Sequence, residues 1–315
     1  MRKEGDKPKR NWKKIIFAAI VFYIFLFVGI GLIMSPMLET EIVSQAVHRY
    51  SVINFSAQEL ADNHARSRPT VEISEDIAIP ELPEIIQNLP EIDRNDIIGF
   101  VTIESVGIFL PVFYGATHVN LLAGAGTMRP NQLMGQGNFA LAGHHMRDPS
   151  LLFGPLLNVR EGHWIQLSNG NDVYTYRVFR TELIHQSQVD VIDDTADAIV
   201  TLFTCDVPTH GTDFRFLVQG ELIDTSEIGH VNITPGIGGV AIAQGQEIST
   251  FAASFLNYRQ RIVTTHEELG MYFWLLQVAG IALAADIVGM LLFLGIERKY
   301  QQIKRRNAEK FKYPV

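Results

Sequence analysis

Two long apolar segments lie near the ends of the chain, and shorter apolar runs fill the region between them. Residues 15–34 form an unbroken apolar stretch of 20 positions. As a helix, such a stretch reaches about 30 Å, the thickness of the hydrocarbon core of a bilayer. The residues that follow offer no small-residue cleavage site of the kind that ends a signal peptide. The pattern therefore predicts an uncleaved transmembrane anchor.

The second apolar segment covers residues 271–296 and is interrupted by Gln277 and Asp286. An Asp near the centre of a membrane helix costs roughly 3 kcal/mol on insertion scales, which the surrounding Leu, Ile, Val, Phe and Ala residues offset. We expect a second transmembrane helix here, with a buried amphipathic helix as the alternative.

The pattern changes twice between these segments. Residues 36–64 carry apolar positions at a spacing of three to four, which predicts a helix. Residues 69–92 contain four prolines among many acids, a composition that opposes a helix and favours an extended stalk. A Gly-rich, weakly patterned connector follows Asp224.

From residue 97 onward the apolar runs are short and are separated by Gly, Asn and Asp, as is typical of β-strands. Short helices are expected at 116–124 and 151–159, and SNGND at 168–172 predicts a hairpin turn. Seven or eight short strands over about 130 residues predict a mainly β fold built on one closed or nearly closed barrel. The predicted strands include 97–103, 107–113, 138–145, 163–167, 172–184, 198–205 and 215–223.

Charge divides the chain in the same way. Seven basic residues lie within 1–14 and seven within 297–315. The region between them holds the other 12 of the 26 basic residues, all arginine, and 30 of the 34 acidic residues, which gives it a net charge of about −18. Because cytoplasmic segments beside membrane spans are rich in Lys and Arg, we expect both tails inside the cell and residues 35–270 outside. Anionic lipid would hold the tails, and the overall charge of −8 argues against nucleic-acid binding.

The predicted organisation therefore has seven parts. They are a basic tail (1–14), an anchor (15–34), a helical and Pro-rich stalk (35–96), a β barrel (97–224), a linker (225–270), a second span (271–296) and a second basic tail (297–315).

Cys205 is the single cysteine, so a disulfide framework and a four-thiolate zinc site are excluded. A lone cysteine is commonly a small core residue. However, Cys205 ends a predicted strand beside the loop DVPTHGTD, where a substrate would reach it. Alternation along the strand places Thr201, Phe203 and Cys205 on one face.

A cysteine nucleophile needs a proton-transfer partner and a group that stabilises the oxyanion. His144 and His145 lie in the run NFALAGHH; as neighbours on a strand they would point to opposite faces, with Ala142 sharing the face of His144. Such a doublet is a poor metal chelate. Arg215 opens the strand after the loop that follows Cys205, so it would lie beside the thiol if the two strands form a hairpin. A solvated strand-end charge is the alternative.

Four blocks in this order and spacing resemble the sortases, the cell-surface transpeptidases of Gram-positive bacteria. They are GAGTMRPNQLMGQGNFALAGHHM (124–146), LLFGPL (151–156), TLFTC (201–205) and RFLVQG (215–220). The resemblance covers about residues 97–222, and the first block is similar to class A, the housekeeping group. It implies an eight-stranded sortase-type barrel, here flanked by two transmembrane helices in a bacterial cell membrane.

The resemblance also implies a mechanism. Cys205 would attack the Thr–Gly bond of a Leu-Pro-x-Thr-Gly sorting signal on a surface protein, and an amine, usually of the lipid II cross-bridge, would resolve the thioester. His144 would act as general acid and base, and Arg215 would hold the substrate backbone and the oxyanion. Substrate-binding positions of the family match Ala142, Thr201 and Phe203, with Thr204 and His145 as supporting candidates. No cofactor is implied. Calcium, which activates some class A enzymes, is left open by the acids Asp190, Asp193 and Asp194.

A C-terminal span is typical of class C, the pilus polymerases, yet residues 61–96 lack the Asp-Pro-aromatic lid motif of that class. We therefore expect a class A-like catalytic domain with an additional anchor. A pilus-polymerising sortase that uses a pilin lysine as acceptor is the alternative. A hydrolytic cysteine protease and a non-catalytic surface module compete less well.

Overall fold

The computed structural model describes residues 12–51, 54–66, 70–71, 73, 79–208, 212–227, 280, 295, 297–304 and 306. The chain forms two compact units, Met1–Ser254 and Phe255–Val315, and the elements below belong to the first. The predicted linker beyond residue 227 and the predicted second span, except for Gly280 and Gly295, lie outside the described residues.

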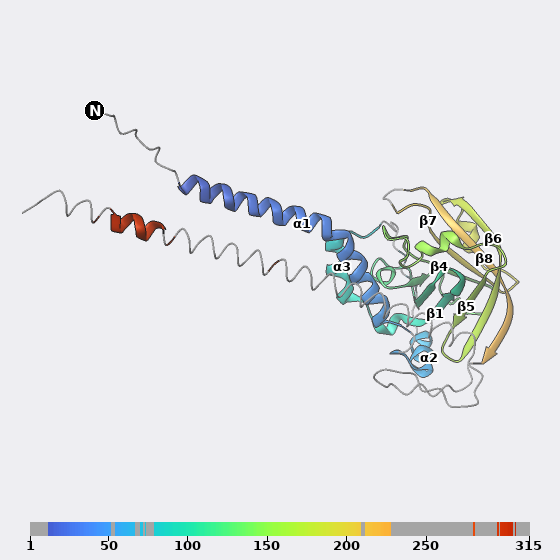
Figure 1. Ribbon diagram of the computed structural model, residues 1–315. Helices are drawn as coiled ribbons and strands as arrows, with labels where there is room; N and C mark the ends of the chain where they lie inside the picture. Colours follow the sequence, from blue (N-terminus) through green and yellow to red (C-terminus); the bar gives the residue numbers. More distant parts are fainter. Residues whose placement is uncertain are drawn as a thin grey trace, which may run out of the picture. The chain divides into compact units, whose positions relative to one another are not determined.

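Eight strands close into a barrel in the order β1-β2-β3-β4-β7-β8-β6-β5 (Figure 1). Most neighbours are antiparallel, but β2 pairs with β3, and β4 with β7, in parallel. The strands are β1 (Ile97–Ile103), β2 (Ile108–Phe113), β3 (Ala125–Thr127), β4 (Asn138–Ala142), β5 (Trp164–Ser168), β6 (Asp172–His185), β7 (Ile199–Cys205) and β8 (Phe214–Glu227).

The predicted barrel is thus confirmed, and seven of its strands lie where the apolar runs placed them. The prediction missed β3, because three residues are too few to show a period of two. The turn at 168–172 joins β5 and β6 as an antiparallel hairpin. The two short helices within the barrel are 3-10 turns, η5 (Asn120–Leu122) and η6 (Gly154–Asn158). Further 3-10 turns are η2 (Leu89–Glu91), η3 (Arg94–Asp96), η4 (Glu104–Val106) and η7 (Val189–Ile192).

Two predictions for the region before the barrel are correct only in part. The helix expected over 36–64 is instead the end of a longer helix, α1 (Trp12–Arg49), followed by a separate α2 (Ala57–Ala65). Ser56 starts α2 because its side chain and that of Glu59 form a capping box. The stalk, expected to be extended, contains α3 (Leu82–Asn88), which tolerates Pro83 because the first turn of a helix needs no N–H donor there.

Among the described helices, none is by itself both long and apolar enough to cross a bilayer. One bent pair, Ile20–Leu32 and Ser35–Arg49, meeting at 45°, satisfies the requirement by length and composition only. The anchor predicted for residues 15–34 stays a prediction.

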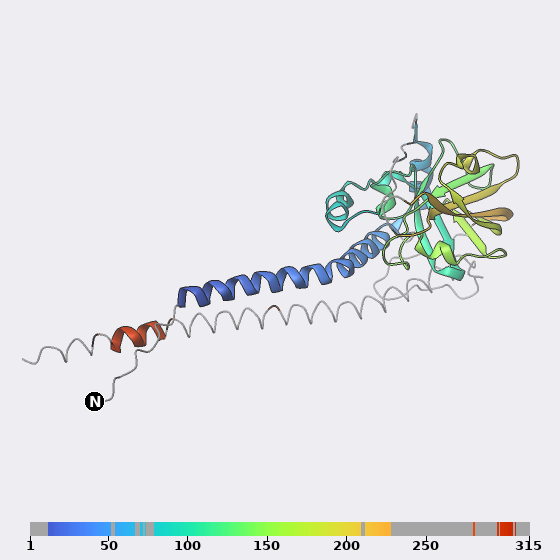
Figure 2. The ribbon, with the colours of Figure 1, turned by 90° about the horizontal axis from the view of Figure 1, so that it is seen from above.

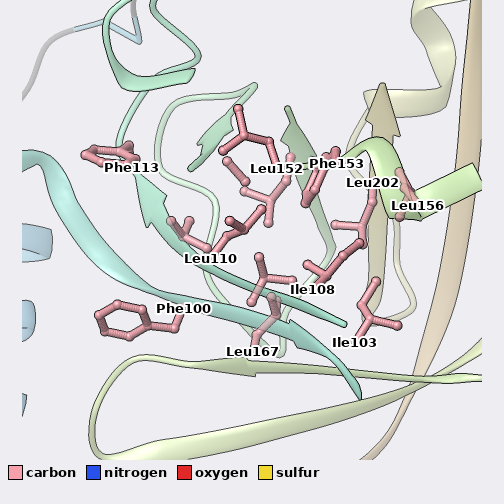
Figure 3. Packing of buried hydrophobic residues seen from close by; sticks show 14 of the residues in the cluster. Phe100, Ile103, Ile108, Leu110, Phe113, Leu152, Phe153, Leu156, Leu167 and Leu202 are labelled. Atoms are coloured by element: carbon pink, nitrogen blue, oxygen red, sulfur yellow. The ribbon is translucent and has the colours of Figure 1, made fainter. Parts of the chain in front are cut away.

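A large apolar core fills the barrel (Figure 3). Strands on opposite sides of the barrel contribute to it, as with Phe100, Ile108, Leu167 and Leu202, while Phe153 reaches it from the segment before η6. Burying a side chain of this size contributes about 1.5–3 kcal/mol. The core therefore holds the strands that carry the site in one register.

The C-terminal part of α1 packs against this core. Val43, Ala46 and Val47 are buried members of it, and the ring of Tyr50 lies edge-on to that of Phe113 with centroids 6.3 Å apart. The end of α1 lies beside the barrel in both ribbon views (Figure 2). This part of α1 belongs to the folded domain.

Candidate active site

β7 and β8 are antiparallel, and their register places Cys205 directly opposite Arg215. Residues that face each other across antiparallel strands project from the same side of the sheet. The prediction that Arg215 lies beside the thiol if these strands pair as a hairpin is therefore confirmed for the backbone.

The same face carries two more cross-strand pairs, Thr201 with Gln219 and Phe203 with Leu217. The intervening residues Val200 and Leu202 belong to the main core of the barrel. The predicted alternation along β7 is therefore confirmed, with Thr201, Phe203 and Cys205 on one side.

A polar chain runs across this face, away from the thiol. The side-chain amide of Gln219 donates to Oγ1 of Thr201 at 3.1 Å, and Nη1 of Arg180 donates to Oε1 of Gln219 at 3.1 Å. Because Thr201 and Gln219 are both buried, these bonds satisfy groups that water cannot reach.

β4 lies beside β7 in parallel, with Ala142 level with Phe203. Gly143 continues the pairing by donating its N–H to the Phe203 carbonyl at 3.2 Å. His144 lies two residues after Ala142, and Cys205 lies two residues after Phe203. These two positions therefore lie at the same edge of the sheet. The predicted strand 138–145 is too long, because β4 ends at Ala142.

His144 is fully enclosed. The residue is 1% exposed, and its Nε2 is a buried atom without a hydrogen-bond partner. Burial, and secondarily the nearby imidazole of His118, lowers the pKa of His144 to about 3. The two rings lie edge to face with centroids 6.4 Å apart. His144 is therefore neutral near pH 7, and its buried Nε2 has no hydrogen-bond partner among the described residues.

His145 lies beyond the end of β4, so the alternation of side chains assumed for the histidine doublet does not apply. Its Nδ1 lies 3.0 Å from the carbonyl oxygen of Cys205; because a carbonyl only accepts, Nδ1 carries the proton. His145 also pairs with Leu152 in an isolated bridge. His145 thus contacts the main chain of the cysteine, and the expectation that it faces away from His144 stays a prediction.

Thr204 makes a second contact between the two sides of the site. Its Oγ1 donates to the buried carbonyl of Gly143 at 2.7 Å. A Cβ atom at Gly143 would lie 2.6 Å from the ring of Phe153, so only glycine lets the chain pass there. The next residue, His144, accepts a hydrogen bond from the Phe153 N–H at 3.0 Å. The histidine segment is therefore held from both sides.

The guanidinium of Arg215 is bound to neutral oxygens. Nη1 donates to the carbonyls of Thr212 and Phe214 at 2.7 and 2.9 Å, and Nη2 donates to Oε1 of Gln186 at 3.0 Å. None of these acceptors cancels its positive charge. Sequence reasoning missed Gln186 and His118, because nothing in the local pattern indicates that they approach Arg215 and His144.

A second apolar cluster adjoins the candidate residues. Phe203 and Ala142 belong to it together with Leu217 and Ile184. From the loop between β2 and β3 it receives Ala116 and Leu121. It is separate from the core inside the barrel. Two predicted substrate-binding positions thus share one buried apolar cluster with residues of strands β6 and β8.

The connection between β6 and β7 covers part of this cluster through Val191 and Ile192. Two side chains from the start and approach of β4 hold that connection. The Asn138 amide donates to the carbonyl of Val191 at 3.0 Å, and Arg129 forms an ion pair with Asp194 at 3.2 Å. Asp194 also accepts from the N–H of Asn138 at 3.2 Å.

These contacts assemble a thiol, a neutral imidazole and a free positive charge at one edge of the barrel. A thiol beside an imidazole suits nucleophilic attack on a carbonyl, with the proton moving to the ring. The guanidinium can stabilise the oxyanion that such an attack creates. Within the described part of the chain, no group of three or more His, Cys, Asp or Glu residues is arranged to hold a metal ion.

Comparison with known proteins gives consistent matches. The family model of the sortase domain matches residues 101–223. Sortase A of Listeria monocytogenes is 39% identical over 205 residues, covering 65% of this chain and 91% of that protein. Sortase A of Bacillus anthracis is 30% identical over 213 residues, covering 68% and 97%. The crystal structure of Listeria monocytogenes sortase A aligns with a TM-score of 0.42 and 47% identity, covering 43% of this chain and 92% of that one.

Proposed function

The chain belongs to the sortase family of cysteine transpeptidases and is class A-like, and we propose that it attaches surface proteins to the cell wall through a thioester on Cys205. The substrate is a sorting signal of the Leu-Pro-x-Thr-Gly type, cut between Thr and Gly. The observation that carries this proposal is the shared edge of β4, β7 and β8, where Cys205 is paired with Arg215 and His144 follows two residues after Ala142, the partner of Phe203.

The first half-reaction forms the acyl-enzyme. The sulfur of Cys205 attacks the Thr carbonyl carbon while the thiol proton moves to His144, and Arg215 stabilises the resulting oxyanion. When the C–N bond breaks, His144 returns this proton to the departing glycine amine. Burial lowers the pKa of His144 to about 3, so the ring is neutral before substrate binds and carries the proton only between these two steps.

The second half-reaction consumes the thioester. An amine attacks the same carbonyl carbon, His144 takes a proton from the amine, and the C–S bond breaks to leave a new amide. The proton then returns to the thiolate of Cys205. The enzyme is unchanged at the end, and one peptide bond has been exchanged for another.

The second apolar cluster supports a peptide substrate. Phe203 keeps a small exposed part of its ring on the strand face that carries Cys205, which suits the Leu and Pro of the signal, while the buried Ala142 packs beneath it. Thr204 and Thr201 are buried and fully engaged by Gly143 and Gln219. We therefore assign them to shaping the site rather than to direct contact with substrate.

We further propose that the enzyme is membrane-bound, with its catalytic domain outside the cell and both tails in the cytoplasm. The N-terminal part of α1 supports an anchor, because it presents large apolar side chains that the protein does not cover. They are Phe17, Ile20, Phe22, Ile24, Phe25, Leu26, Val28, Ile30 and Leu32. A reporter fused after Val315 should be cytoplasmic, and one inserted near Gly236 should be external; an external C-terminal reporter would contradict a second span.

The test of activity uses the full chain in detergent and a sorting-signal peptide with a reporter on each side of the Thr–Gly bond. With a glycine-based amine, mass spectrometry should show the ligated product. Without an amine it should show an adduct on Cys205. Cleavage without ligation would indicate a protease, and neither product would indicate a non-catalytic module. A pilin-type lysine peptide that outcompetes the glycine amine would favour the pilus alternative.

A further inference from the structure

Arg147 joins three separate segments of the chain. Its Nη1 lies 3.2 Å from Oε2 of Glu39 on α1, and its Nη2 lies 2.7 Å from Oε1 of Glu81, which precedes α3. The contact with Glu39 spans 108 residues of sequence. Arg147 itself comes three residues after His144, so the two helices meet the histidine segment at this side chain.

Glu39 is unusual for its position. Glu39 is only 2% exposed and lies on the part of α1 that packs against the barrel through Val43 and Val47. Burial raises the pKa of Glu39, an effect that Arg147 opposes. A carboxylate that loses its hydration here gains little net stability from one partner, since replacing a buried ion pair by neutral groups is often neutral or stabilising.

Glu81 does not explain the cluster by stability either. Its side chain is 49% exposed and that of Arg147 is 43% exposed. Ion pairs between such exposed groups contribute little, because water and salt screen them. The arrangement buries the charge of Glu39, which is unfavourable, and fixes the position of the Arg147 side chain.

The segment between the two histidines and Arg147 has little freedom to absorb a shift. His145 is held by the Cys205 carbonyl, and Met146 is 1% exposed in the barrel core. On the other side, the His144 carbonyl is bound by the N–H of Phe153. A displacement of Arg147 would therefore pass to residues that contact the nucleophile.

We propose that Arg147 is a positioning residue through which the docked helices α1 and α3 hold the His144 segment against Cys205, so that the catalytic rate depends on the helix that leads toward the membrane. The inference rests on the proposed function. The apolar N-terminal part of α1 continues, through a 45° bend between Leu32 and Ser35, into the docked part that carries Glu39.

The decisive variant is Glu39→Gln in the full chain in detergent. The amide keeps the shape and removes the buried charge, so unfolding should be unchanged or occur at higher denaturant concentration. We expect kcat for ligation to fall about 10-fold with little change in KM for the peptide, since small misplacements of reacting groups reduce rate strongly. A variant that is as stable as the wild type but slower cannot be explained by structural damage.

Arg147→Ala should lower kcat by a similar factor, and Arg147→Lys should restore it only in part, because an ammonium cannot bridge two carboxylates as a planar guanidinium does. We also expect the pH dependence of the rate at which iodoacetamide alkylates Cys205 to differ from wild type in Arg147→Ala and in Arg147→Lys. Arg94→Ala is the matched control, since it removes an ion pair of similar exposure with Glu59 on α2, which does not involve the histidine segment. It should leave kcat and the pH profile of alkylation unchanged.

Wild-type kcat in Glu39→Gln would overturn the inference, as would an equal loss in Arg94→Ala. If the wild-type chain itself forms no adduct on Cys205, the proposed function fails instead. The two failures are therefore distinguishable in one set of assays.

Discussion

The two sides of the active site are built in different ways. Cys205 and Arg215 are placed by strand pairing, in a ladder of seven paired positions between β7 and β8. His144 lies past the end of its strand, and its segment is held by the side chain of Thr204 and the main chain of Phe153, and, in the inference above, by Arg147. The strand pairing tolerates the loss of one contact, because many hydrogen bonds along the ladder stabilise it together. The histidine side depends on single contacts, so it is the side that substitutions should disturb without unfolding the barrel.

The largest effect is expected at the nucleophile. Cys205→Ala should abolish both cleavage and ligation, because the chain contains no other thiol to form the thioester. The ladder should survive, since alanine fits the strand. Mass spectrometry should show no peptide adduct, with unfolding by denaturant close to wild type. Residual ligation would disprove the assignment of the nucleophile.

The next largest effect tests the histidine side. His144→Ala should reduce kcat/KM by roughly 10²–10⁴-fold, the usual contribution of a placed acid–base group. His145→Ala should cost about 10-fold, through the lost contact to the Cys205 carbonyl. For both variants, the peptide adduct on Cys205 is measured by mass spectrometry in the absence of an amine. If His145→Ala proves the more damaging change, the roles of the two histidines are reversed.

Arg215 tests the ladder side in turn. Arg215→Ala should cost on the order of 10²–10³-fold in kcat, as expected for loss of an oxyanion donor. Arg215→Lys should recover only part of this, because a point charge does not copy the fork. Gln186→Ala, which frees Nη2, is the companion variant. Full activity of Arg215→Lys would show that charge alone suffices.

Thr204 connects the two sides, and its loss should have a moderate effect. Thr204→Val removes the hydrogen bond to the Gly143 carbonyl and leaves a buried acceptor unpaired, which costs about 1–3 kcal/mol of stability. We expect kcat to fall about 10-fold. Thr204→Ser keeps the hydroxyl and should restore most of the rate. Equal activity of both variants would mean that the contact does not position the histidine segment.

The smallest effect concerns stability against acid. A histidine whose pKa is lowered in the folded state binds its proton more readily when unfolded, so stability falls as the pH drops from about 6.5 towards 3. The wild type should therefore lose about 1 kcal/mol more than His144→Asn between pH 6.5 and 5.5. Urea unfolding at the two pH values measures this, with His64→Asn on α2 as control. The raised pKa of Glu39 acts in the opposite direction but is common to all three proteins.

The sequence predicted the ladder side better than the histidine side, and the reason is physical. A period of two is visible in AIVTLFTC and RFLVQG, so alternation identified the face that Thr201, Phe203 and Cys205 share. Where β4 ends depends on the ring of Phe153 against Gly143, a contact between distant residues that no local pattern encodes. His118 and Gln186 were missed for the same reason. The helix α3 was missed because Pro83 was weighed without its place in the first turn, and the break before α2 follows from the capping box of Ser56 and Glu59.

The parallel pairing of β4 with β7 also has a kinetic consequence. The His145 ring and the Cys205 carbonyl that meet at the ends of these strands are 60 residues apart, so a long loop must close before they touch. Contacts between residues so far apart in the sequence form late and slowly in folding. During folding, the thiol of Cys205 therefore exists for some time without the histidine segment beside it. In the mechanism proposed above, its acid–base partner His144 is in place only once β4 and β7 have paired.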